Sequence, residues 1–170
     1  MLPYVYFCDD SQMDCTFLGM AADIAPDPPA RMLPPLNAGN RAFWTGGVDG
    51  ALVISWCAAC KRYVQPPSAD CPTCEGELVP RAVSGRGTVF TYTVNHQRFM
   101  PNVAVPYVIA IVELEEQPDL RIATNIVDCQ PNSVFVGLPV EVRFERQDVG
   151  EESVYVPVFA PRSEERAVPH

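Results

Sequence analysis

Two Cys-x-x-Cys pairs constrain this chain more than any other feature of its sequence. Cys57 and Cys60 form the first pair, Cys71 and Cys74 form the second, and ten residues separate the pairs. Each pair is typical of a tight turn that places two sulfurs on one ion, and the intervening segment can return the chain across that ion. The spacing predicts one tetrahedral metal site with four thiolate ligands.

The chemistry of four thiolates favours a structural zinc ion. Zinc tolerates an all-sulfur tetrahedron and has no redox demand, while iron in a rubredoxin-like centre and a pair of disulfides are the alternatives. Because the protein supplies all four ligands, no position stays open for water or substrate. We expect the site to stabilise the fold and not to catalyse a reaction.

Charge and cysteine content narrow the class of protein. The chain has 170 residues, 48% of them apolar and 18 of them proline, so it can bury a core but is poorly suited to long helices. Its net charge of −9 disfavours nucleic acid and anionic membrane surfaces as partners. Cysteines at metal-ligand spacing indicate a reducing compartment, and the N-terminus has neither a basic flank nor a long apolar run. We expect a cytoplasmic protein without a secretory signal or membrane span.

Four segments follow from composition and pattern. We assign residues 1–36 to an acidic, proline-rich arm, 37–80 to a short helix and zinc ribbon, 81–161 to an OB-fold, and 162–170 to a polar tail. Five aspartates and no lysine or arginine occur in the first thirty residues. The aromatic residues of this arm, which could dock on a partner, are Tyr4, Tyr6, Phe7 and Phe17.

Five strand-like runs follow the ribbon. They are residues 88–94, 107–114, 120–127, 140–146 and 154–159. The run 107–114 is continuously apolar, as in a buried strand, and the others alternate or are rich in β-branched and aromatic residues. Five short strands without a substantial helix favour a mainly β protein with a small barrel, for which the OB-fold is the natural candidate. Before the ribbon we expect a short helix from Asn37 to Trp44, ended by Gly46 and Gly47.

No catalytic constellation emerges from the sequence. His96 and His170 are the only histidines, and a nucleophile beside His96 would be a guess without geometry. Gly85 and Gly87 are too few for a dinucleotide fingerprint and predict a bend that opens the first barrel strand. We assign no catalytic residue, and the sequence does not favour a stand-alone enzyme.

One stretch contrasts with the acidic background. Between Leu78 and Val112 there is no aspartate or glutamate. The basic residues in this stretch are Arg81, Arg86, His96 and Arg98. Such a surface suits the phosphates of a nucleotide-like cofactor, with a solvated strand face as the equal alternative. Tyr92 and Phe99 could stack on a base or belong to the core.

The ordered motifs resemble a known family. The matching residues are Phe43, Trp44, Gly50, the four cysteines with Pro66, Pro67 and Pro72, then Ser84 to Val89, Tyr107, Val112 to Leu114, Thr124, Asn125 and Gly137 to Val140. Residues 40 to 160 in this way resemble the bacterial and archaeal proteins that join a rubredoxin-like zinc ribbon to an OB-fold and are associated with acyl-CoA metabolism. The first 35 residues lie outside the resemblance.

The resemblance implies a non-catalytic accessory subunit. Members of this family pair with thiolase-fold enzymes, including acyl transferases and steroid side-chain aldolases, and some assemble with hot-dog-fold enoyl-CoA hydratases. It implies a structural zinc and a role in holding the CoA part of an acyl-CoA, for which Arg86, His96 and Arg98 are the expected contacts. The alternative is a single-stranded nucleic-acid-binding protein built from the same two folds, which the acidic balance disfavours.

Overall fold

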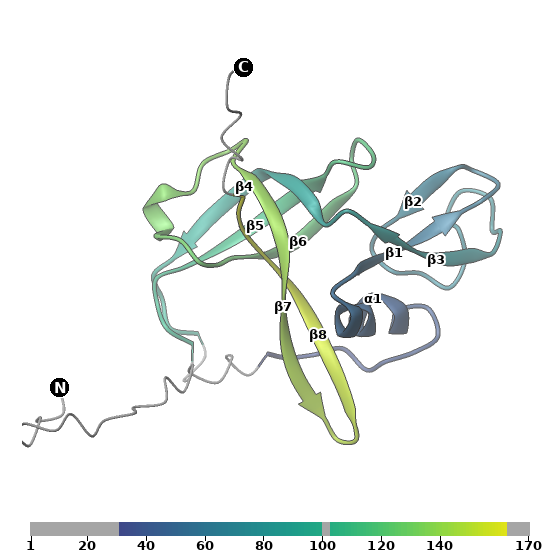
Figure 1. The fold of residues 1–170 in the computed structure, drawn as a ribbon, viewed down its shortest axis with the longest axis horizontal. Coiled ribbons are helices and arrows are strands. Elements are labelled where there is room, and N and C mark those ends of the chain that lie inside the picture. The colour runs from purple at the N-terminus through teal and green to yellow at the C-terminus, as the bar shows by residue number, and fades with distance from the viewer. Residues whose placement is uncertain (1–30, 100–102, 163–170) are drawn as a thin grey trace, which may run out of the picture.

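A three-stranded ribbon and a five-stranded barrel make up the part of the chain that the computed structural model describes, residues 31–99 and 103–162 (Figure 1). The helical elements are α1 (Arg41–Thr45) and the 3-10 turns η1 (Gly46–Asp49) and η2 (Pro131–Ser133). The ribbon strands are β1 (Leu52–Cys57), β2 (Arg62–Val64) and β3 (Leu78–Val83). The barrel strands are β4 (Arg86–Asn95), β5 (Tyr107–Leu114), β6 (Arg121–Ile126), β7 (Pro139–Val149) and β8 (Glu152–Pro161). None of the helices within the described residues is long and apolar enough to cross a membrane.

The barrel confirms the predicted mainly β fold and its OB-type topology. Its strands close in the order β4-β5-β6-β8-β7, and every neighbouring pair is antiparallel except β6 and β8. The β6–β8 seam is short, with one parallel residue pair between Ile126 and Phe159 and a hydrogen bond from Thr124 Oγ1 to the Pro157 carbonyl at 2.9 Å. The long strands β7 and β8 continue past the barrel as a hairpin beside α1 (Figure 1).

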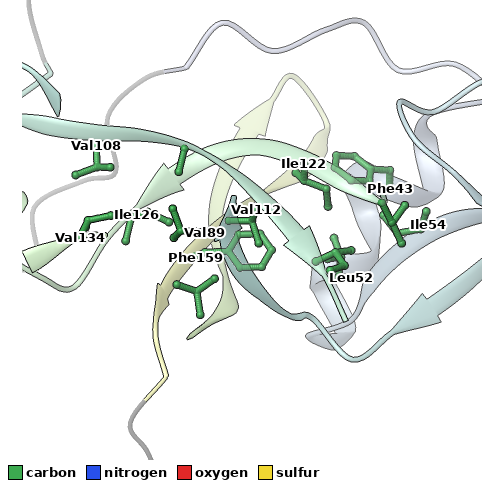
Figure 2. Close-up of a cluster of buried hydrophobic side chains, with 14 residues drawn as sticks. Phe43, Leu52, Ile54, Val89, Val108, Val112, Ile122, Ile126, Val134 and Phe159 are labelled. Carbon is green, nitrogen blue, oxygen red and sulfur yellow. The ribbon is translucent and has the colours of Figure 1, made fainter. Parts of the chain in front are cut away.

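The barrel and the base of the ribbon share one hydrophobic core. Inward-facing residues of β5 alternate with outward-facing ones, as the two-residue period of a strand requires. Phe43 of α1 and Leu52 and Ile54 of β1 lie beside Ile122 of the barrel and belong to the same buried cluster (Figure 2). The ribbon is therefore joined to the barrel by packing as well as by the chain.

The short helix differs in detail from its prediction. The Asn37 side chain does accept hydrogen bonds from the backbone N–H groups of Gly39 and Asn40, at 2.9 and 3.1 Å, but this caps a turn, and α1 begins only at Arg41. As predicted, α1 ends just before the two glycines, with Gly46 as its C-cap, and the 3-10 turn η1 then carries the chain to a left-handed residue, Gly50, with φ of 70°.

Gly47 also has a packing role that its place after the helix did not predict. A Cβ atom at this position would lie 2.4 Å from Cβ of Tyr155 and 2.6 Å from Cδ1 of Phe144. Only a residue without a side chain lets η1 approach the β7–β8 hairpin this closely.

A glutamine in the β5–β6 turn ties the ribbon to the barrel. Gln117 Oε1 accepts a hydrogen bond from the backbone N–H of Tyr63 at 2.8 Å, and its Nε2 donates to the Tyr63 carbonyl at 3.4 Å. The side chain thereby pairs with β2 much as a neighbouring strand would. The turn at Gln117 to Asp119 is thus also a contact between the two parts.

Candidate functional site

Four sulfur atoms converge at the outer end of the ribbon. Cys57 ends β1, Cys60 lies in the turn before β2, and Cys71 and Cys74 occupy the turn before β3. The four Sγ atoms lie within 4.8 Å of one another, with 3.6 Å between Cys57 and Cys74 and 3.8 Å between Cys60 and Cys71. A regular tetrahedron with zinc–sulfur bonds of ~2.3 Å has sulfur–sulfur edges of about 3.8 Å. The predicted site is therefore formed, with dimensions that fit zinc.

The two cysteine turns have the same backbone form. In each, the residue after the second cysteine has left-handed geometry, with φ of 52° at Lys61 and 57° at Glu75. The first turn is closed by a hydrogen bond from the Cys60 N–H to Cys57 Sγ, and the second by one from the Glu75 N–H to the Cys71 carbonyl at 2.8 Å. Cys-x-x-Cys spacing predicts such turns. It does not predict the left-handed geometry of Lys61 and Glu75, because lysine and glutamate rarely adopt it.

The sulfurs hold protons unequally when no cation is present. Hydrogen bonds from the backbone N–H groups of Thr73 and Cys74 lower the pKa of Cys71 to about 6. The hydrogen bond with the Cys74 sulfur, together with burial, raises the pKa of Cys60 to about 12. Four neighbouring thiolates therefore need a compensating positive charge, which a bound divalent cation supplies.

The site is closed and therefore suited to a structural role. Cys57 and Cys71 are buried, and the protein provides four ligands to a tetrahedral ion. An ion bound in this way has no free position at which to activate water or polarise a substrate. The arrangement stabilises the two turns and leaves catalysis to another protein or another site.

The residues predicted to contact CoA are separated by the length of β4. Arg86 begins this strand, whereas His96 and Arg98 follow its end, and all three are exposed. Ten strand residues span up to about 30 Å. The structure brings His96 and Arg98 into one loop but keeps Arg86 away from them, so Arg86 and Arg98 cannot contact the same phosphate group.

Sequence reasoning missed the apolar outer face of the barrel. β5 is not buried on both faces as predicted, because Ile109 and Ile111 expose 42% and 36% of their surface. Tyr92 and Phe99 are exposed as well, which excludes them from the core. A continuous apolar run gives no sign that one of its faces is open; only the pairing of β4, β5 and β6 in the folded chain reveals it.

Comparison with known proteins gives two matches to family models. Residues 44–79 match the model described as "ChsH2, rubredoxin-like zinc ribbon domain". Residues 80–145 match "ChsH2, C-terminal OB-fold domain". The two matches follow each other directly along the chain; the first covers the ribbon up to the start of β3, and the second covers the rest of β3, the strands β4 to β6 and the first half of β7.

Individual relatives agree with the family models. A "DUF35 domain-containing scaffold protein" of Methanocaldococcus jannaschii is 39% identical over 102 residues, which are 58% of this chain and 71% of that protein. A "Probable enoyl-CoA hydratase alpha subunit" of Thermomonospora curvata is 35% identical over 134 residues, and the match covers 77% of this chain but only 40% of the relative.

A solved structure agrees as well. The structure titled "Ltp2-ChsH2(DUF35) aldolase" matches with a TM-score of 0.65 and 34% identity over 76% of this chain and 98% of that chain. The match is long enough to include both the ribbon and most of the barrel. The chain belongs to the DUF35 family, in which a ChsH2-type zinc ribbon precedes an OB-fold.

Proposed function

We propose that this chain is a non-catalytic accessory subunit that binds a thiolase-like enzyme and helps to hold the CoA part of its acyl-CoA substrate. The observation that carries the proposal is the match to nearly the whole length of a chain in a structure titled as an aldolase of Ltp2 and ChsH2. The name of the T. curvata relative includes a CoA-dependent activity, and a scaffold name in M. jannaschii suggests a non-catalytic role. A steroid side-chain aldolase complex is the specific assignment that we favour.

The chemistry of the described residues supports an accessory role. The metal site has its four ligands from the protein, so it offers no reactive position. Among the described residues, no hydrogen bond joins His96 to a serine or cysteine that it could activate as a nucleophile. These features support an accessory role in which a partner supplies the catalytic groups.

The loop after β4 is the part that we assign to the CoA phosphates. His96 and Arg98 are exposed there, and the strands on either side carry no carboxylate between Arg86 and Val112. An anion near this loop meets the positive charge of Arg98, and the stretch of sequence that contains the loop adds no carboxylate, in a molecule whose net charge is −9. Arg86 joins the same ligand only if that ligand follows β4 along its length.

Complex formation is the first test. The zinc-loaded chain is mixed with Ltp2, the protein named with ChsH2 in the solved aldolase structure, and the mixture is analysed by size-exclusion chromatography with light scattering. We expect a complex of defined mass that cleaves acyl-CoA, whereas the isolated chain shows no turnover. Failure to bind both Ltp2 and a thiolase-like aldolase from the chain's own organism would contradict the proposal.

Substitution of the loop cations is the second test. In the active complex, Arg98→Ala combined with His96→Ala should raise the Michaelis constant for acyl-CoA about 3- to 10-fold. It should leave kcat unchanged, because contacts to the CoA phosphates stabilise the bound substrate and the transition state equally. Arg146→Ala is the matched control, since this exposed arginine pairs with Asp148 on β7. An unchanged Michaelis constant would remove the loop from the ligand site. Tight, steeply salt-dependent binding of a single-stranded oligonucleotide would instead favour the nucleic-acid alternative.

A further inference from the structure

An apolar strip lies on the outside of the barrel, across β4 and β5. It consists of Phe90, Ile109 and Ile111, which expose 44%, 42% and 36% of their surface, and we call it the outer strip. Ile111 is paired with Ala123 of β6 and Ile109 with Asn125. Directly paired residues point to the same face of a sheet, so the outer strip runs along β5 and reaches Asn125 at one end.

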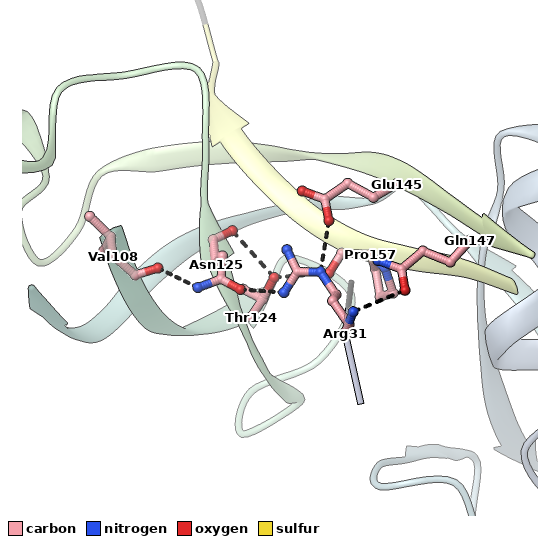
Figure 3. A network of polar contacts seen from close by, with 7 residues as sticks. All are labelled: Arg31, Val108, Thr124, Asn125, Glu145, Gln147 and Pro157. Carbon is pink, nitrogen blue, oxygen red and sulfur yellow. Dashed lines mark hydrogen bonds and ion pairs between the residues drawn. The ribbon is translucent and has the colours of Figure 1, made fainter. Parts of the chain in front are cut away.

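The chain enters the described structure at that same end. The Arg31 side chain donates from Nη1 to Asn125 Oδ1 and from Nε to Glu145 Oε2, each at 2.7 Å, and its backbone N–H donates to Gln147 Oε1 at 3.1 Å (Figure 3). Asn125 is itself held by donating to the Val108 carbonyl at 2.8 Å. Both charged groups of the Arg31–Glu145 pair are about one-fifth exposed, so this anchor is largely shielded from water.

The preceding segment has the length and composition to cover the outer strip. Thirty residues come before Arg31, and this is enough to extend roughly 100 Å. The outer strip needs far less, since residues 109 to 113 of β5 span only about 14 Å. The aromatic side chains available to it are Tyr4, Tyr6, Phe7 and Phe17.

The charged side chains that border the outer strip are paired within the described structure. The outer strip lies in a stretch without carboxylates, and the nearest one on β5, Glu113, is engaged by Arg121 at 2.8 Å. Arg121 also lies over the Phe90 ring, 3.6 Å from its centroid. Arg31 and Arg121 thus lie at opposite ends of the outer strip, and each is paired with carboxylates, Arg31 with Glu145 and Arg121 with Glu113 and Asp119.

We propose that residues 1–30 fold back from Arg31 and cover the outer strip of their own chain, with their aromatic side chains against Phe90, Ile109 and Ile111. Arg31 acts as the anchor that starts the segment at the correct end of this face. The inference concerns the free chain and does not depend on the proposed function.

Isoleucine methyl groups provide the test. The chain has six isoleucines, so the zinc-loaded full chain labelled at their δ1-methyl groups gives a spectrum simple enough to assign by single substitutions. We expect nuclear Overhauser contacts to the methyls of Ile109 and Ile111 from the aromatic protons of residues 1–30, in addition to any from Phe90 of the strip itself. Replacing Tyr4, Tyr6, Phe7 and Phe17 together with serine should remove those contacts and shift both signals. The methyls of buried Ile54 and Ile122 should not move, which shows that the variant is folded.

Three results would overturn parts of the proposal. Unchanged Ile109 and Ile111 signals in the four-serine variant would show that residues 1–30 do not cover the strip. Contacts that disappear on dilution, together with a dimer mass, would show that a second copy supplies the segment. Arg31→Ala should weaken the contacts at Ile109, while Arg41→Ala, which removes an exposed 2.7 Å pair with Glu152, should not. Equal spectra for these two variants would contradict the anchoring role of Arg31.

Discussion

The barrel and the outer end of the ribbon are stabilised in different ways. A cluster of fourteen buried residues fills the barrel and the base of the ribbon. The outer end has a separate cluster of only three, Cys57, Val64 and Cys71, and two of these are metal ligands. So few apolar contacts cannot offset the conformational entropy of two ordered turns. The metal ion replaces a hydrophobic core in this region.

The boundary between the two regimes lies inside β1. Leu52 and Ile54 belong to the barrel cluster, whereas Cys57 at the other end of the same strand belongs to the metal site. We call residues 57–76 the ribbon tip. We therefore predict that the base of β1 unfolds together with the barrel, and that the ribbon tip unfolds when the metal is lost.

Loss of one metal ligand should have the largest local effect. Cys71→Ser removes a buried thiolate, and structural zinc sites supply on the order of 10 kcal/mol to folding, so we expect the zinc to be lost and the ribbon tip to unfold. Elemental analysis should fall from about one zinc per chain to near zero. Cys129→Ser, outside the ribbon, is the control and should keep the ion. Full zinc occupancy in Cys71→Ser would contradict the conclusion that this ligand is needed to bind the metal and order the ribbon tip.

A cavity in the barrel should have the next largest effect, and a global one. Phe159 is completely buried, and Phe159→Ala should lower the free energy of unfolding by about 3–5 kcal/mol. Urea unfolding of the zinc-loaded chain, followed by tryptophan fluorescence, measures the change, since Trp44 packs against this core. Val136→Ala, at an exposed position, should change it by less than about 0.5 kcal/mol. A small effect at Phe159 would mean that the barrel does not depend on its core.

Overpacking at the contact between η1 and the hairpin should cost less. Gly47→Ala introduces a methyl group where Tyr155 and Phe144 leave no room, and we expect a loss of about 1–3 kcal/mol in the same unfolding experiment. Val48→Ala, an exposed position of the same turn, is the matched control. Equal stability of the two variants would show that η1 is free to move away from β8.

The polar contact between ribbon and barrel should have the smallest effect. Gln117→Ala removes both hydrogen bonds to Tyr63, and we expect a loss of about 1 kcal/mol without loss of zinc. Gln97→Ala, an exposed residue of the loop after β4, should be neutral. Zinc release by Gln117→Ala would show that the barrel, and not only the metal, maintains the ribbon tip.

Local patterns predicted much of this structure. The spacing of the cysteines was sufficient to predict the metal site, because each turn is determined within four residues. The five barrel strands were predicted at nearly their observed positions, since alternation and β-branched residues act over a few neighbours.

Contacts between distant residues could not be predicted in this way. Arg31 pairs with Glu145, 114 residues away, and nothing near either residue indicates the other. The sequence around Gly47 indicated only the end of a helix. It gave no sign that Gly47 must be small, because the side chain that it approaches, Tyr155, lies in a strand more than a hundred residues later. The exposure of Ile109 likewise depends on which strands become its neighbours. For the same reason, the positions of Arg86 and Arg98 at opposite ends of β4 became evident only from the fold.

Amide hydrogen exchange on the zinc-loaded full chain, before and after chelation, tests the central comparison most directly. We predict that chelation removes protection from the ribbon tip, with Tyr63 and Val64 of β2 as reporters, while Leu52, Ile54 and the strands β4 to β8 keep theirs. Protection retained throughout the ribbon tip, or lost from the barrel at the same time, would contradict the conclusion that the metal stabilises one region and apolar burial the other.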